Sequence, residues 1–103
     1  MSRGMAVLVD ELREYPHVRF AVKHWCHMVS DASFEELHAF AARLGIPRER
    51  FQRDHYDLPP ALRERAVAHG AREVTIHDLS ERMVGPRGDR NRRRRDRRAA
   101  RRG

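Results

Sequence analysis

Four side chains of this 103-residue chain have the chemistry of a metal site or a catalytic site: Asp10, His27, His55 and Asp57. Two carboxylates and two imidazoles suit a divalent transition metal and leave a coordination position open for water. A metal held in this way could activate water against a phosphate ester. The sequence therefore offers these four residues as candidate metal ligands and candidate catalytic residues.

Other interpretations of the same segments stay open. Asp54 or Asp57 could hydrogen-bond to neighbouring backbone N–H groups, as aspartates in turns do, while His55 and Tyr56 pack under the loop. Cys26 could act as a nucleophile, but it precedes His27 in an expected strand, where neighbouring side chains point to opposite faces. It would need a distant partner such as His55, and an inert buried thiol is the alternative.

Charge is distributed unevenly along the chain. Residues 85–103 hold ten arginines and two aspartates, a net charge of +8, whereas residues 1–84 hold 12 basic and 13 acidic residues. Like charges repel and this segment has almost nothing to bury, so we expect a disordered basic tail. Guanidinium groups on a flexible chain attract phosphate backbones without reading sequence. The arginines expected to contact nucleic acid are Arg92, Arg93, Arg94, Arg95, Arg97 and Arg98. The alternative is an extension that only adds solubility.

The remaining composition favours a cytoplasmic protein. Cys26 is the one cysteine and forms no intramolecular disulfide, which suits a reducing compartment. No apolar run approaches the roughly 18–20 residues that span a membrane, and the N-terminus lacks the apolar run of a signal peptide. We therefore expect no membrane partner.

Three segments have the pattern of strands. Residues 5–9 are a continuous apolar run that stops at Asp10, which is typical of a buried strand with an acidic end. Residues 25–29 form a second strand, in which Trp25, His27 and Val29 share one face. Residues 18–22 alternate in a way that suits a half-buried strand or an extended loop. A further strand is expected at residues 73–76.

The helices are marked by their caps. Ser33 and Glu36 fit a capping box at the start of a helix over residues 34–44, and Gly45 ends it in the left-handed conformation. Residues 47–50 form a short turn of helix. Prolines 59 and 60 favour the start of a second helix that ends at Gly70. Asp78 is expected to cap a last short helix over residues 79–83.

This order of elements predicts a small single α/β domain. We expect a short mixed sheet, two main helices and a short C-terminal helix over residues 1–84, followed by the disordered tail of residues 85–103. The segment 51–57 is expected to connect elements near one edge of the sheet.

An ordered set of short segments resembles one family. The segments are, along the chain, Val9-Asp10-Glu11, Trp25-Cys26-His27-Met28, Ser30-Asp31, residues 36–45, Phe51-Gln52, His55-Tyr56-Asp57, Ala66-Val67-Ala68 and Gly70-Ala71. Together they resemble the short bacterial and phage family named domain of unknown function 4031, over about residues 5–80. Members of that family tend to carry an aspartate where this chain has Glu11, and the arginine tail lies outside the resemblance. The resemblance supports the domain boundary and implies no activity.

Two functional hypotheses follow from the sequence. The first is a binding module with a polar His/Asp site and non-specific nucleic-acid contact through the tail. The second is a hydrolase that depends on a divalent metal and acts on phosphate esters or nucleic acid. A purely structural role of the polar segment remains a third interpretation.

Overall fold

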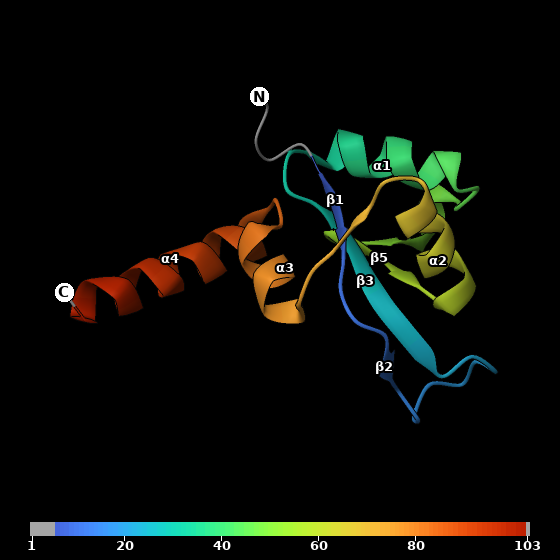
Figure 1. The fold of residues 1–103 in the computed structure, drawn as a ribbon, viewed down its shortest axis with the longest axis horizontal. Helices are drawn as coiled ribbons and strands as arrows, with labels where there is room; N and C mark the ends of the chain where they lie inside the picture. The colour runs from blue at the N-terminus through green and yellow to red at the C-terminus, as the bar shows by residue number, and fades with distance from the viewer. Residues whose placement is uncertain (1–5, 103) are drawn as a thin grey trace.

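The computed structural model describes residues 6–102, and a mixed sheet forms its centre (Figure 1). The strand order is β4-β5-β3-β1-β6, and β2 pairs with β3 outside this path. β1 (Val7–Val9) runs antiparallel to β3 (His24–Ser30) and parallel to β6 (Arg72–Glu73). β5 (His55–Leu58) runs antiparallel to both β3 and β4 (Phe51–Gln52). The predicted α/β domain with a small mixed sheet is confirmed.

Helices cover both faces of this sheet. α1 (Phe34–Arg43) and α2 (Pro60–Ala68) pack on one face, and α3 (Ile76–Arg82) packs on the other. Alternate residues of a strand point to opposite faces, so Met28 belongs to the core under α1 and α2, and Val29 to the core under α3. We refer to the α1/α2 face and the α3 face.

The predicted boundaries of α1 are confirmed. The Ser33 side chain accepts a hydrogen bond from the backbone N–H of Glu36, and Gly45 has a φ of 77° just after the helix. The Glu36 side chain accepts a hydrogen bond from the Ser30 hydroxyl, so it does not complete the expected capping box. The predicted short turn is the 3-10 helix η1 (Arg48–Arg50).

The central segment, predicted as a connection, is instead a β-hairpin. β4 and β5 pair through Gln52 and His55, which leaves Arg53 and Asp54 as a two-residue turn. Arg53 has a φ of 61°, a conformation that such turns usually assign to glycine or asparagine. Arg53 and Asp54 lack that signature, which explains why the sequence did not indicate a hairpin.

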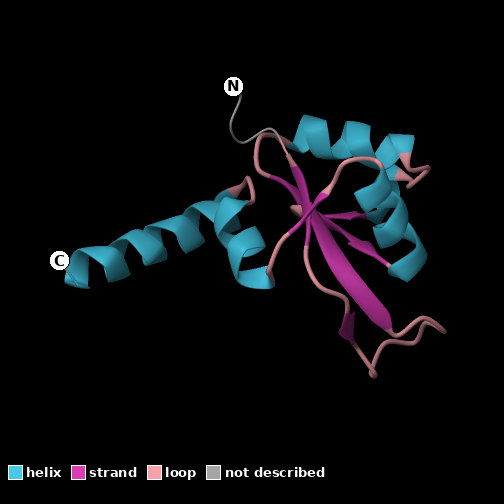
Figure 2. Cartoon of the chain, in the orientation of Figure 1, coloured by secondary structure: helices cyan, strands magenta, loops and turns pink. Residues whose placement is uncertain are grey.

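Other predicted strands are shorter than expected. The first strand begins at Val7, and the expected residue Met5 lies outside the described residues. Residues 18–22 are not a strand: after β2 (Arg13–Glu14) the chain forms an exposed loop that returns to β3, as Figure 2 shows. The expected strand 73–76 is wrong in its second half, because Thr75 caps α3 by accepting a hydrogen bond from the N–H of Asp78.

The expectation of a disordered tail is corrected by the structure, in which Pro86–Arg102 form the helix α4 (Figure 1). Arginine and alanine favour the helix, and the start of α4 packs closely on α3. At Gly88, a Cβ atom would lie 1.9 Å from the Met83 carbonyl oxygen, so only glycine permits this approach. The expectation of disorder was based on repulsion between like charges within the segment. It did not include packing of the segment against α3.

The C-terminal end of α3 supplies hydrogen-bond acceptors for α4. Asn91 donates to the Ser80 carbonyl over 2.8 Å, and the Arg92 guanidinium donates to the carbonyls of Glu81 and Met83 over 3.1 and 2.9 Å. These carbonyls lack helical partners because α3 ends there. The predicted tail is thus anchored through its first half by groups outside it.

Within residues 6–102, no helix combines the length and the apolar character that crossing a membrane requires.

Candidate functional site

Strand register brings three of the four candidate residues together on the α3 face. His27 of β3 is the register partner of Asp57 in β5, and His55 lies two residues before Asp57 on the same face. Each of the three offers a ligand atom, and these atoms lie within 4.8 Å of one another. His55 Nε2 is 3.2 Å from Asp57 Oδ1. We call His27, His55 and Asp57 the ligand cluster.

Asp10 lies behind the ligand cluster and holds His27. Its Oδ2 atom is 2.7 Å from His27 Nδ1, and its Oδ1 atom accepts a hydrogen bond of 2.6 Å from the His27 backbone N–H. Asp10 is fully buried. The prediction of Asp10 as a metal ligand is therefore revised: both its oxygens already orient His27.

Asp54 plays the same part for His55. Its Oδ1 atom is 2.9 Å from His55 Nδ1, and the carboxylate is 2% exposed. The guanidinium of Arg87, at the start of α4, donates to both Asp54 oxygens, over 3.0 Å from Nε and 2.6 Å from Nη2. A bidentate arginine–carboxylate pair of this kind fixes geometry as well as charge.

Both histidines consequently expose the same atom. A buried carboxylate engages Nδ1 in each ring, so Nε2 points away from that carboxylate, and in His55 it lies 3.2 Å from Asp57 Oδ1. Histidines that bind metals in proteins are commonly oriented by a carboxylate or carbonyl in this way. The expectation that Asp54 bonds to neighbouring backbone does not describe these contacts, since its partners are the side chains of His55 and Arg87.

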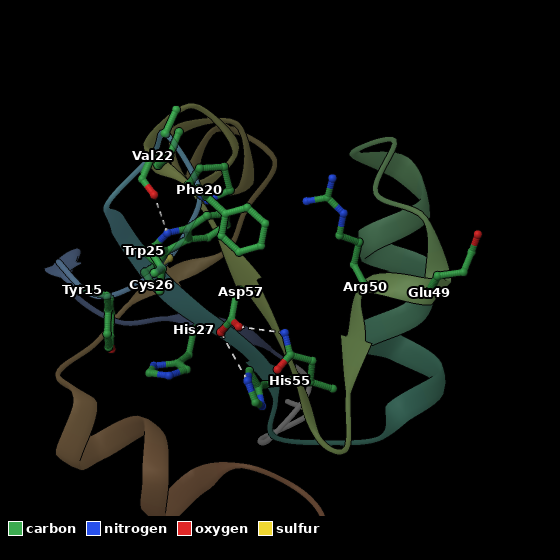
Figure 3. Close-up of a pocket in the computed structure, with 14 residues that line it drawn as sticks. Tyr15, Phe20, Val22, Trp25, Cys26, His27, Glu49, Arg50, His55 and Asp57 are labelled. Carbon is green, nitrogen blue, oxygen red and sulfur yellow. Dashed lines mark hydrogen bonds and ion pairs between the residues drawn. The ribbon is translucent and has the colours of Figure 1, made fainter.

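The ligand cluster borders a pocket of about 770 Å³. Figure 3 shows His27, His55 and Asp57 together at one end of this pocket. The pocket walls come from the loop that precedes β3 and from η1, so elements far apart in sequence enclose it. Gln52 donates a hydrogen bond of 2.9 Å to Asp57 Oδ2, which holds that carboxylate beside His55.

Cys26, Tyr56 and Glu11 are close to the candidate residues in sequence but have other roles. Burial, followed by the charge of Asp10, raises the pKa of Cys26 to about 12, so the thiolate is scarce at neutral pH and the residue fits the inert buried thiol. Tyr56 lies on the α1/α2 face, where its hydroxyl is 2.8 Å from His38 Nδ1. Glu11 accepts a hydrogen bond from the backbone N–H of Ile76 at the start of α3.

Hydrogen bonds and charge shift the pKa values of Asp54, His55 and Asp57 in the hairpin. Burial acts to lower the pKa of His55, but hydrogen bonds to Asp57 and Asp54 outweigh burial and raise it. The hydrogen bond from His55 lowers the pKa of Asp57. For Asp54, burial acts to raise the pKa, and the bonds from Arg87 and His55 reverse that effect and lower it. The three groups therefore stabilise one another in their charged forms.

Sequence reasoning missed Arg87 because it sits in the segment assigned to the disordered tail. The segment contains ten arginines of similar surroundings, and nothing in the sequence distinguishes the one that reaches back to the hairpin. Asp54 was noted beside His55, but its burial follows from the unpredicted turn.

The site thus defines a small α/β protein with a candidate centre of two histidines and one aspartate. The chain belongs to the family described as protein of unknown function (DUF4031), whose model matches residues 7–85. The resemblance seen in the sequence is confirmed, and Arg87 lies just beyond the matched region. No curated protein and no solved structure matches the chain.

Replacing Arg87 should destabilise the protein through Asp54. Arg87→Ala leaves a buried carboxylate without its bidentate donor, and we expect a loss of about 2 kcal/mol in the free energy of unfolding. Arg94→Ala removes an exposed arginine of the same helix and should change stability by less than about 0.5 kcal/mol. Urea denaturation measures both. Equal effects of the two substitutions would show that Arg87 does not support Asp54.

The metal-free protein should lose stability as the pH rises above neutrality because of His55. Its folded pKa lies above 6.5, so its contribution is full below pH 6.5 and is lost as the pH rises through the folded pKa. Asp54 and Asp57 contribute above pH 3.8, and that contribution is lost as the pH falls through their lowered values. We expect His55, Asp54 and Asp57 to stabilise the folded protein most between about pH 3.8 and about pH 6.5.

Urea denaturation near pH 5.5 and near pH 8.5 checks this expectation against Asp57→Asn, which removes one partner of His55. The wild-type protein should lose more stability across this interval than the variant does. His38, whose pKa burial lowers, is common to both proteins and cancels in the comparison. A loss of the same size in the variant would refute the assignment to His55.

Proposed function

We propose that this protein binds a divalent transition metal at the ligand cluster and uses it to hydrolyse phosphate esters. The observation that carries the proposal is the convergence of three ligand atoms within 4.8 Å, with the Nδ1 atom of each histidine held by a buried carboxylate. Both rings turn Nδ1 toward a buried carboxylate and Nε2 away from it, which is the common orientation of histidines that bind metals.

The spacing of the ligand atoms suits a metal. Ligands at about 2.1 Å from a tetrahedral ion lie about 3.4 Å apart. His55 Nε2 and Asp57 Oδ1 are already 3.2 Å apart, and the ligand atom of His27 lies within 4.8 Å of the other two, so binding would shorten its distances by about 1.4 Å at most. Two nitrogens and one carboxylate oxygen suit Zn²⁺, Mn²⁺ or Fe²⁺ and leave a position open toward the pocket.

That open position would hold the water that reacts. A bound divalent metal can lower the pKa of its water to about 7, far below the value in bulk solution, and so supply hydroxide at neutral pH. In the hydrolysis the water oxygen bonds to phosphorus, the ester P–O bond breaks, and the departing alcohol takes up a proton. Arg50 lines the same pocket and would attract the phosphate oxygens.

Metal binding should depend on both histidines and on the carboxylates behind them. In a competition titration with Zn²⁺ and Mn²⁺, the protein should bind one equivalent, and His27→Ala and His55→Ala should abolish that binding. Asp10→Asn should weaken it about 10–100-fold by releasing the ring of His27. Hydrolysis of p-nitrophenyl phosphate esters should stop with EDTA and return with the metal.

His24→Ala is the matched control, because it removes an exposed imidazole from the same strand as His27. It should bind metal as the wild-type protein does. Absence of a stoichiometric metal in the wild-type protein, or equal loss in the control, would rule out the ligand cluster as the metal site.

A second function, contact with nucleic acid through α4, is favoured by the distribution of ion pairs on this helix. Arg93, Arg94 and Arg97 are exposed and pair with no acidic residue that the structure describes. The other three predicted contacts are engaged within the protein: Arg92 pairs with Asp89, and Arg95 and Arg98 lie near Glu81. A helix that presents unpaired guanidinium groups suits non-specific contact with a phosphate backbone.

The triple variant Arg93→Ala/Arg94→Ala/Arg97→Ala should weaken duplex DNA binding and its salt dependence. Each phosphate contact contributes about 0.9 to the slope of log K against log salt, so the slope should fall in magnitude by up to about 3. Fluorescence anisotropy with a duplex of arbitrary sequence measures this.

A variant of equal charge, Arg48→Ala/Arg65→Ala/Arg72→Ala, removes exposed arginines outside α4 and is the control. It should retain most of the salt dependence. If both triple variants reduce the slope alike, binding follows net charge and α4 is not its site.

A further inference from the structure

The loop between β2 and β3 places an aromatic surface at the pocket that folding does not explain. Phe20 is 64% exposed, yet its ring lies 5.7 Å from that of Trp25, centroid to centroid. Both residues line the pocket that the ligand cluster borders. Val22 of the same loop is 41% exposed and lines the same pocket, and apolar side chains gathered at a groove are typical of a ligand-binding surface.

Hydrogen bonds hold this aromatic surface in place. The Trp25 indole N–H donates to the Val22 carbonyl over 3.1 Å, and the Tyr15 N–H donates to the Lys23 carbonyl over 2.7 Å. The indole is therefore satisfied as a donor, and what it offers to a ligand is the surface of its ring. An indole ring held in this way can contact a nucleobase, and the Phe20 ring beside it is inclined to it by 58°.

A cationic side chain faces the aromatic surface. Figure 3 shows the side chain of Arg50 extending into the space between η1 and the rings of Phe20 and Trp25, while Glu49 points away. Arg50 makes no ion pair with the acidic residues of the part of the chain that the structure describes. Its guanidinium is thus available for a ligand anion.

From this arrangement we propose that the pocket binds a nucleotide, either free or as part of a nucleic-acid strand. The base stacks on the exposed ring of Phe20. The ring of Trp25, inclined by 58° to that of Phe20, contacts the edge of the base, and the phosphate lies between Arg50 and the ligand cluster. This proposal names a substrate class for the proposed hydrolysis, and its phosphate half rests on that function. Its base half does not require the metal. The pocket volume of about 770 Å³ lies within the range of small-molecule sites, about 300–1,000 Å³.

The arginines of α4 favour phosphate-bearing ligands over other flat molecules. The free guanidinium groups raise the local concentration of polyanions around the protein. A ligand with a flat ring attached to a phosphate suits the whole pocket, because the ring can contact the aromatic side chains while the phosphate contacts the arginine and the metal. A nucleotide has this combination of base and phosphate, and single-stranded nucleic acid repeats it along the strand.

Trp25 is the only tryptophan of the chain, so its fluorescence reports directly on the pocket. We expect adenosine monophosphate to quench this fluorescence saturably in the full-length protein, with or without EDTA. Ribose 5-phosphate lacks the base and should not quench. Phe20→Ala should weaken nucleotide binding by about 5–150-fold, the range expected for loss of one stacking contact, and Phe20→Tyr should retain it.

Two further variants make the test specific. Leu12→Ala removes an exposed apolar side chain that does not line the pocket, and it should bind as the wild-type protein does. Arg50→Ala should weaken binding of adenosine monophosphate and leave that of adenosine unchanged. Calorimetry repeats each measurement without relying on fluorescence.

The outcomes separate this proposal from the metal function. If no metal binds, quenching by adenosine monophosphate in EDTA still supports the base site. If metal binds with one equivalent but Phe20→Ala binds the nucleotide as well as the wild-type protein does, the nucleotide proposal is overturned. Short oligoadenylate identifies the source of the ligand: tighter binding that Arg93→Ala/Arg94→Ala/Arg97→Ala reduces points to a strand, and equal binding points to a free nucleotide.

Discussion

The antiparallel pairing of β3 with β5 determines almost everything about the candidate site. It sets His27 opposite Asp57 and places His55 on the same face, whereas a shift by one residue would turn these side chains toward the α1/α2 core. The buried alternation of Met28, Tyr56 and Leu58 makes such a shift costly, because it would expose the core and bury polar groups. The hydrophobic core on the α1/α2 face thereby fixes the position of the ligand cluster on the α3 face.

Two buried carboxylates extend this constraint outward from the sheet. Asp10 and Asp54 are almost inaccessible to water, and a charged group in that position must be paired. Asp10, which follows β1, pairs with His27, and Asp54, in the hairpin turn, pairs with His55. Both histidines belong to the α3 face. The same hydrogen bonds therefore pair the two buried carboxylates and orient the two imidazoles, although the residues come from separate parts of the chain.

Local signals in the sequence sufficed for the helices but not for the full site. Ser33 and Gly45 mark the ends of α1 through side-chain capping and left-handed backbone, which are properties of a few neighbouring residues. The hairpin at Arg53 and Asp54 lacks such a signal, because the pairing of β4 with β5 places Arg53 in a conformation that its own preference opposes. His27, His55 and Asp57 were identified by their chemistry. The role of Arg87 depends on packing between distant segments, which residue spacing does not encode.

The bond between Arg87 and Asp54 has a practical consequence for how this family's domain is delimited. The matched region ends at residue 85, so a protein truncated at that limit would keep every strand and the ligand cluster but lose Arg87. Asp54 would then remain enclosed in the hairpin without its guanidinium partner, and the orientation of His55 would loosen. A fragment chosen by family boundaries alone could fold and still be a poor guide to the behaviour of the whole chain.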